Sequence, residues 1–166
     1  MALMNEDTQL KDAGKTVGGK HLTFKLGNED YGIEILKIKE IIGIMPITTV
    51  PQTPDYVKGV VNLRGRIIQV VDLRMMFGMA PMDYTDRTCI VVVEIQGPSE
   101  VVFIGLVVDS VSEVVNLKPE NIEDVPEFSA DLDTDYILGL AKTDGRVKIL
   151  LDIEKMLNID ELDKAA

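Results

Sequence analysis

Apolar and polar residues alternate over several short stretches of this chain, which is the pattern of half-buried β-strands. Residues 21–26 and 31–35 alternate in this way, and the turn-forming sequence GNED separates them. Together they predict a β-hairpin. Residues 38–44 are rich in isoleucine but include Lys39 and Glu40, so they predict a strand with one exposed side. Three prolines within residues 45–54 predict a loop after it.

One structural unit occurs twice along the chain. Residues 56–78 and 136–158 are identical at six of 23 positions when shifted by 80, and residues 32–42 match residues 105–115 at a shift of 73. Each copy contains five short strands, within about 21–86 and 87–158. Short, curved strands hide their edges by closing into a barrel. The sequence therefore predicts an all-β fold of two pseudo-repeated five-stranded barrels.

The predicted organisation has a flexible tail at 1–20 and a folded region at 21–158. Subdomain 1 is expected at about 21–86 and subdomain 2 at about 87–150, with a C-terminal helix and tail at 152–166. A short helix follows each copy, and an aspartate at its start can accept hydrogen bonds from the free N–H groups of the first turn. Residues that recur in both copies are assigned to the fold itself: Gly65, Arg66, Asp72, Gly145, Arg146 and Asp152.

Composition argues against several classes of function. The net charge is −11, and tryptophan is absent. An acidic surface repels nucleic acid and anionic lipid, so we expect neither as a partner. Apolar runs are too short for a transmembrane helix, and the N-terminus lacks the pattern of a secretory signal. We therefore expect a cytoplasmic protein without direct membrane insertion.

The residues needed for catalysis or metal binding are scarce. The chain has one histidine and one cysteine, too few for a zinc site or a Cys–His pair. His21 is expected to be a surface residue at the start of a strand, and Cys89 to be a core residue. Asp72 and Asp152 could form an acid/base pair, but helix capping explains both positions. We therefore predict no enzyme, no cofactor and no metal.

The differences between the two copies indicate a contact site. Asn62-Leu63-Arg64 in the first copy stands where the second has Lys142-Thr143-Asp144. Asp-Gly suits a type I′ hairpin turn, whereas Arg64-Gly65 does not. An exposed leucine and arginine at such a turn favour a binding surface, with a solvated arginine as the alternative. Residues 35–44 are also more apolar than a half-exposed strand requires, which favours either an interaction surface or burial between the barrels.

Two segments, YGIEILKIKEIIG and YVKGVVNLRGRIIQVVDLRMMFG, resemble the CheW family of bacterial chemotaxis coupling proteins. They are similar also to the matching regulatory domain of the histidine kinase CheA. The likeness runs from about residue 21 to 158, with Gln69 where the family usually has proline. It implies two five-stranded SH3-like barrels in a non-enzymatic adaptor, recruited to membrane receptor arrays, which bridges chemoreceptors and CheA. A helical hairpin at the cytoplasmic tip of the receptor is expected to dock between the barrels.

The resemblance also implies two sets of contact residues. The set expected to bind the receptor comprises Ile35, Ile38, Glu40, Ile41, Asn62, Leu63 and Arg64. The set expected to bind the kinase comprises Ile44, Pro46, Ile47 and Gly59. Two other interpretations remain: a CheW-like regulatory module of a larger signalling protein, and an enzyme that uses carboxylates in the cleft between the barrels.

Overall fold

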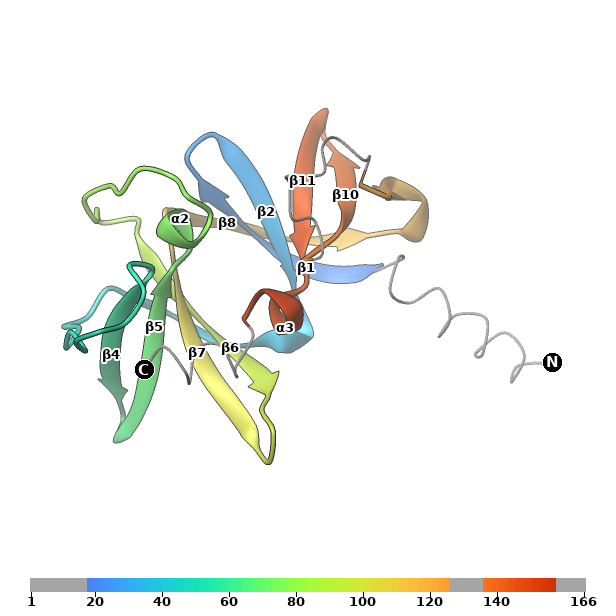
Figure 1. The fold of residues 1–166 in the computed structure, drawn as a ribbon. Helices are drawn as coiled ribbons and strands as arrows, with labels where there is room; N and C mark the ends of the chain where they lie inside the picture. The colour runs from blue at the N-terminus through green and yellow to red at the C-terminus, as the bar shows by residue number, and fades with distance from the viewer. Residues whose placement is uncertain (1–17, 126–135, 158–166) are drawn as a thin grey trace.

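The computed structural model describes residues 18–125 and 136–157, which form two curved β-sheets with few helices (Figure 1). The first sheet, here called barrel A, has the order β8-β1-β2-β11-β10-β9. Its strands are β1 (Gly19–Leu26), β2 (Glu29–Glu34), β8 (Ser110–Leu117), β9 (Ile122–Glu123), β10 (Ile137–Thr143) and β11 (Arg146–Leu151). The predicted all-β class with two barrel-like units is confirmed, but barrel A has six strands rather than the predicted five, because the two-residue β9 pairs with β10.

The second sheet, here called barrel B, has the order β3-β6-β7-β5-β4. Its strands are β3 (Ile38–Gly43), β4 (Val57–Leu63), β5 (Arg66–Asp72), β6 (Cys89–Gln96) and β7 (Val101–Val108). Short helical segments connect or follow the strands: η1 (Ile35–Lys37), α2 (Leu73–Met76), η2 (Pro119–Asn121) and α3 (Ile153–Met156).

Each barrel combines strands from both sequence copies. The hairpin β1-β2 of the first copy pairs with β8 and β11 of the second, and the hairpin β6-β7 of the second pairs with β3 and β5 of the first. The barrels therefore do not coincide with the ranges 21–86 and 87–150 that the repeat suggests. The physical reason is the connection after each hairpin, since η1 and the turn at Asp109 carry the chain from one sheet to the other.

The ends of the chain also differ in detail from the expected ranges. Gly19 and Lys20 already belong to β1, so the first strand begins before His21. The rest of the predicted tail, residues 1–17, lies outside the described residues. At the other end α3 is described for Ile153–Met156, and residues 158–166 of the predicted helix and tail are outside the described part.

This exchange of strands predicts that neither half of the chain folds alone. Residues 1–86 would leave the β1-β2 hairpin without β8 and β11, and isolated two-stranded hairpins are marginally stable. We expect fragments 1–86 and 87–166, expressed separately, to show no cooperative thermal unfolding by circular dichroism. Mixing the two fragments should restore it. Cooperative unfolding of fragment 1–86 by itself would contradict the observed strand pairing.

Within the described part of the chain, buried side chains form three clusters. The largest lies between the two sheets and receives Leu22, Phe24, Ile33, Val91, Val93, Ile104 and Leu106, among others. A second cluster fills barrel B, with Val61, Ile68, Val70, Ile90, Val92 and Val107. A smaller one fills barrel A, with Leu117, Ala141 and Leu150. The two barrels thus share one apolar interface, and each has an interior of its own.

His21 is buried, and the prediction that it lies on the surface is wrong. Its side chain is 1% exposed, with Nδ1 3.1 Å from the carbonyl oxygen of Gly19. Four consecutive residues, 21–24, are buried because β1 is a central strand with the barrel A interior on one side and barrel B on the other. Alternation alone could not reveal burial on both faces. Cys89 is half-buried and packs against the inter-barrel core, as expected for a packing residue.

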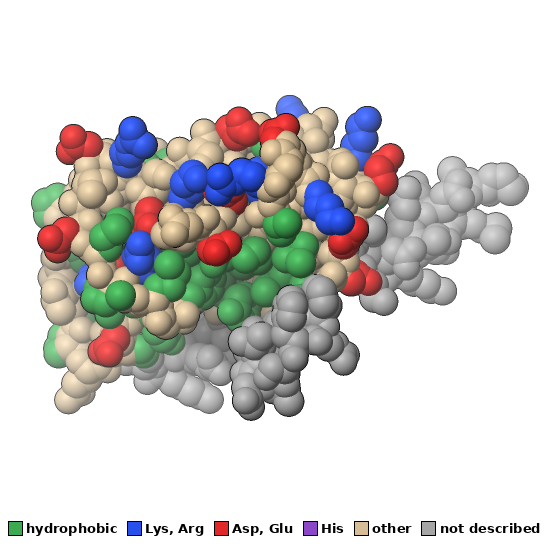
Figure 2. Space-filling view, turned by 90° about the horizontal axis from the view of Figure 1, so that it is seen from above, with side chains coloured by type: hydrophobic (Ala, Val, Ile, Leu, Met, Phe, Trp, Pro, Cys, Tyr) green, Lys and Arg blue, Asp and Glu red, His purple; other side chains and the backbone are tan. Residues whose placement is uncertain are grey.

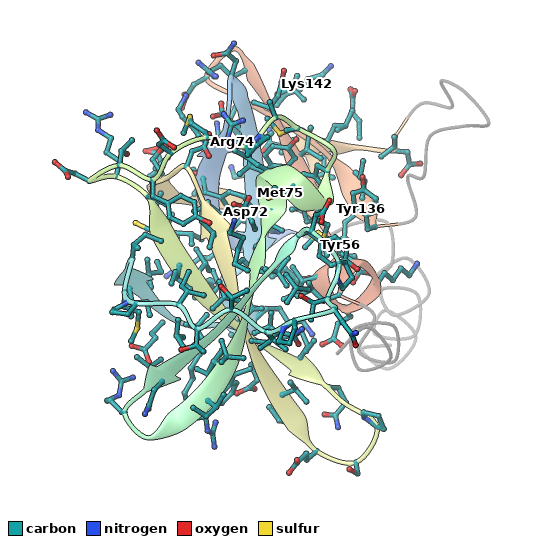
Figure 3. The ribbon with its side chains drawn as sticks, turned by 60° about the vertical axis from the view of Figure 1, so that its left-hand side comes forward. Tyr56, Asp72, Arg74, Met75, Tyr136 and Lys142 are labelled. Atoms are coloured by element: carbon teal, nitrogen blue, oxygen red, sulfur yellow. The ribbon has the colours of Figure 1, made fainter. Side chains whose placement is uncertain are left out.

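The two aspartates at the helix starts act as N-caps, as predicted. Asp72 Oδ1 accepts a hydrogen bond from Met75 N at 3.3 Å, and Asp152 Oδ1 accepts from Lys155 N at 3.2 Å. Figure 3 shows Asp72, Arg74 and Met75 at α2. Asp72 also accepts from the hydroxyl of Tyr84 at 3.0 Å. Burial, together with this carboxylate, raises the pKa of Tyr84 above its ordinary value.

Candidate partner-binding site

The turn between β4 and β5 has the type I′ conformation expected from its equivalent in the second copy. Arg64 and Gly65 have φ of 52° and 87°, and Asp144 and Gly145 have φ of 53° and 76°. A positive φ is uncommon for arginine and costs conformational energy. The side chain of Asn62 supports the turn by accepting a hydrogen bond from Gly65 N at 2.8 Å. The chain therefore holds Arg64 in a conformation that its residue type disfavours.

Arg64 forms an ion pair with Glu40 of β3. Strands β3 and β4 are opposite edges of the barrel B sheet, so this pair connects the two edges at one mouth of the barrel. The arginine side chain is 68% exposed and the glutamate 27%. Exposed pairs of this kind contribute about 0–1 kcal/mol to stability. The pair therefore fixes the geometry of the mouth more than it stabilises the fold.

A pocket of about 230 Å³ opens at this mouth beside the ion pair. Arg66 lies with its guanidinium carbon 4.4 Å from the ring centroid of Phe103, and Lys39 Nζ is 5.7 Å from the same centroid. Leu63, expected to be exposed, is half-buried against the barrel B core. The full lining is Lys39, Glu40, Leu63, Arg64, Arg66, Ile68, Val92 and Phe103.

A β-bulge in β3 separates the predicted receptor residues into two groups. The register shifts between Ile38 and Glu40, so Ile38 and Ile41 both lie opposite valines of the inter-barrel core, whereas Glu40 lies opposite a valine of the barrel B interior. Strict alternation would have placed Ile38 and Glu40 on the same face. The bulge thus directs the two isoleucines toward the region between the barrels and the glutamate toward the pocket.

The second copy supplies two equivalent residues that the sequence reasoning missed. Val111 and Val114 of β8 correspond to Ile38 and Ile41 at the shift of 73. They lie opposite Phe24 and a further residue of the inter-barrel core. Ile41 is 41% exposed and Val114 51%. We call Ile38, Ile41, Val111 and Val114 the inter-barrel strip; the repeat itself was the signal that could have identified its second half.

The remaining predicted receptor residues are more dispersed. Ile35 is half-buried on η1 and packs against the inter-barrel core. Asn62 is exposed beside the turn that it supports. The structure therefore brings together Glu40, Leu63 and Arg64 at the pocket and Ile38 and Ile41 on the strip, and places Ile35 and Asn62 apart from them.

The four predicted kinase residues lie on or beside the loop between β3 and β4. Ile44 and Pro46 are exposed, and Ile47 packs against the barrel B core. Hydrogen bonds between Thr48 and Val60, of 2.8 and 2.9 Å, attach the loop to β4 next to Gly59. Gly59 is itself buried. Any effect of Gly59 on a partner must therefore act through the position of this loop.

The surface is not uniformly acidic despite the net charge. Figure 2 shows acidic and basic side chains interspersed around a hydrophobic area in the middle of one face. Across residues 18–125 and 136–157, no helix has the length and hydrophobicity required to span a bilayer. The same residues contain no group of three histidine, cysteine or acidic side chains placed to hold a metal ion.

Comparisons with known proteins agree with these features. A family model described as the CheW-like domain matches residues 20–161. The chain is 44% identical over 155 residues to chemotaxis protein CheW of Klebsiella aerogenes, covering 93% of this chain and 91% of that protein. It is 35% identical over 136 residues to chemotaxis protein CheW of Thermotoga maritima, covering 82% and 85%.

A solved structure shows the same fold. The crystal structure of the scaffolding protein TtCheW from Thermoanaerobacter tengcongensis is similar with a TM-score of 0.76 and 33% sequence identity. The match covers 87% of this chain and 96% of that one. The resemblance recognised in the two sequence segments is therefore confirmed. With a family model that spans almost all of its described residues, the chain belongs to the CheW-like domain family.

Proposed function

We propose that this protein is a non-enzymatic chemotaxis adaptor that couples transmembrane chemoreceptors to the histidine kinase CheA in a ternary signalling complex. The observation that carries the proposal is the convergence of Glu40, Leu63 and Arg64 at one pocket on barrel B. Glu40 comes from β3, whereas Leu63 and Arg64 come from the end of β4 and the turn after it, where the two copies differ. The shared fold does not require residues that differ between the copies, so their difference favours a role in binding a partner.

The receptor-facing surface combines the inter-barrel strip with the Glu40–Arg64 pair. The strip offers half-exposed aliphatic side chains to the apolar face of a helical hairpin. The charged pair sets the register and the orientation of that helix through polar contacts. Apolar area thus contributes affinity, and the ion pair contributes specificity.

The kinase-facing surface is formed by Ile44, Pro46 and Ile47 on the loop that follows β3. Because these residues differ from those of the receptor surface, both partners can bind the same molecule at once. The loop is hydrogen-bonded to β4 and packed on the barrel B core, so the two surfaces belong to one rigid unit. A receptor that changes its position against β3 would thereby change the position of the kinase.

Arg64→Ala tests the receptor surface. We expect it to weaken binding of a chemoreceptor cytoplasmic fragment by about tenfold, because it removes the charged group that fixes the register of the partner. The thermal midpoint should hardly change, since the side chain is mostly exposed. Co-sedimentation with receptor fragment and CheA, followed by kinase assay, measures both binding and coupling.

Arg87→Ala is the matched control, because this arginine is exposed in the connector between the copies and away from the pocket. It should bind receptor as the parent does. Equal co-sedimentation of Arg64→Ala and the parent would contradict the assignment of the receptor surface.

We place the protein in the cytoplasm at membrane receptor arrays, with no nucleic-acid partner and no cofactor.

Two other functions are weaker candidates. A CheW-like regulatory module of a larger protein would use the same two surfaces. An enzyme with carboxylates between the barrels would need free acidic groups there, but Asp72 and Asp152 accept hydrogen bonds at helix starts.

A further inference from the structure

The repeat places the same arginine at the mouth of each barrel with a different partner. In barrel A, Arg146 Nε donates to Asp30 Oδ2 at 2.7 Å, and the Asp30 side chain is 8% exposed. The shift of 80 relates Arg146 to Arg66, and the shift of 73 relates Asp30 to Phe103. Parallel pairing of β11 with β2 and of β5 with β7 puts both pairs in the same register. Barrel B therefore has an aromatic ring where barrel A has a carboxylate.

The contact with Phe103 leaves the hydrogen-bonding capacity of Arg66 unused. A guanidinium that lies over a ring contacts it through the positive charge, while its N–H donors remain directed outward in their own plane. Among the described residues, no ion pair or side-chain hydrogen bond involves the guanidinium of Arg66. Lys39 approaches the same ring and likewise has no carboxylate partner in that part of the chain. Both side chains lie near the ring, and no carboxylate within residues 18–125 and 136–157 neutralises either of them.

The charge of the pocket is opposite to that of the protein as a whole. Lys39, Arg64 and Arg66 line it together with a single carboxylate, that of Glu40, which is already paired with Arg64. The whole chain carries a net charge of −11. A local excess of cations in a partly enclosed site favours an anionic group, and the planar guanidinium is suited to a carboxylate.

We infer that Arg66 and Lys39, held on the ring of Phe103, form a binding site for an aspartate or glutamate side chain of the chemoreceptor tip. The partner carboxylate meets the outward-directed N–H donors of Arg66, because the ring of Phe103 fills the place that Asp30 takes beside Arg146 in barrel A. The inference rests on the proposed function and specifies the chemistry by which the receptor is recognised. Glu40 in the same pocket repels a dianionic phosphate more strongly than a carboxylate, which favours an acidic side chain over a phosphorylated one.

Arg66→Met in the full chain tests this site, because methionine keeps the apolar stem and removes the charge. We expect the affinity for a chemoreceptor cytoplasmic fragment to fall by about tenfold. The dependence of that affinity on salt concentration should also become weaker, a change that a purely structural role would not produce. Arg66→Lys should recover part of the affinity, and Phe103→Leu should lose part of it because the arginine is no longer held in place.

Arg146→Met is the control, since it is the same substitution at the equivalent position of barrel A. Arg146 is already paired with Asp30, which also contacts Lys25 Nζ at 3.4 Å, so receptor affinity and salt dependence should match those of the parent while the thermal midpoint falls. Charge reversal identifies the partner residue: Arg66→Glu should lose binding and regain it with one acidic-to-lysine substitution in the receptor tip.

The outcomes separate the two hypotheses. If the parent protein fails to bind receptor fragment, the proposed function is overturned, and this inference with it. If the parent binds and Arg66→Met retains both the affinity and the salt dependence, the inference alone is overturned. A loss confined to binding of the CheA regulatory domain would also overturn it, because the carboxylate would then come from the kinase.

Discussion

Gly59→Ala is expected to lower the free energy of unfolding by about 3 kcal/mol, from backbone strain and a steric clash combined. Gly59 has a φ of +140°, which side-chain-bearing residues rarely adopt. A β-carbon at this position would lie 2.0 Å from the carbonyl oxygen of Thr48 and 2.7 Å from its carbonyl carbon. Because these are backbone atoms, the loop between β3 and β4 must move. Urea unfolding followed by circular dichroism measures the change.

Gly139→Ala is the control from the second copy. Its β-carbon would meet Ile122 Cγ2 at 2.8 Å and Glu123 O at 3.0 Å, without a positive φ. The shortest contact is with a side chain, which can yield, and the carbonyl oxygen lies at 3.0 Å rather than at the 2.0 Å found for Gly59, so we expect a loss of about 1 kcal/mol. Equal costs at the two glycines would contradict this account.

Displacement of the loop between β3 and β4 by Gly59→Ala should also weaken binding of the CheA regulatory domain more than binding of receptor, if Ile44, Pro46 and Ile47 form the kinase surface.

Arg64→Glu is expected to reduce receptor affinity by about 100-fold, because it places a second negative charge beside Glu40 and reverses the charge offered to the partner. The fold should tolerate it, since the side chain is mostly exposed and the native pair contributes little stability. Isothermal titration with receptor fragment, together with kinase activation in the ternary mixture, measures the loss.

The double variant Glu40→Arg with Arg64→Glu shows whether the pair acts within the protein or on its partner. The exchange restores opposite charges across the mouth of barrel B. If the pair served only to connect β3 with the β4-β5 turn, the double variant would bind like the parent. We expect binding to remain impaired, because the partner then meets the charges in reversed positions. Full recovery would assign the pair to the architecture of the barrel.

Local chemistry made much of the fold predictable. The aspartates before the two helices were recognisable as caps, and Asp144-Gly145 indicated the turn type of both hairpins. Each of these features depends on a few consecutive residues whose hydrogen bonds and φ angles are set within one turn. Arg64 was identified because its residue type departs from what such a turn prefers.

Two features of the binding site depend on contacts that are distant in sequence. The bulge in β3, which separates Ile38 and Ile41 from Glu40, is a property of its pairing with β6. Arg66 and Arg146 occupy equivalent positions, and the sequence assigned both to the fold. Each meets a strand of the other copy, where Arg66 contacts an aromatic ring and Arg146 a carboxylate. Neither is encoded in any short segment.

The sequence alone determined the strands, the duplicated unit, the turns and caps, and the resemblance to CheW, because all of these are written in local periodicity and in residue types at fixed spacing. The tertiary structure decided which copy each strand pairs with, why His21 is buried, and which charges meet at the mouth of barrel B. Strand pairing joins residues across long stretches of chain, and an internal repeat makes each strand compatible with two equivalent partners. Only the connections through η1 and Asp109, together with packing between the sheets, select one of them.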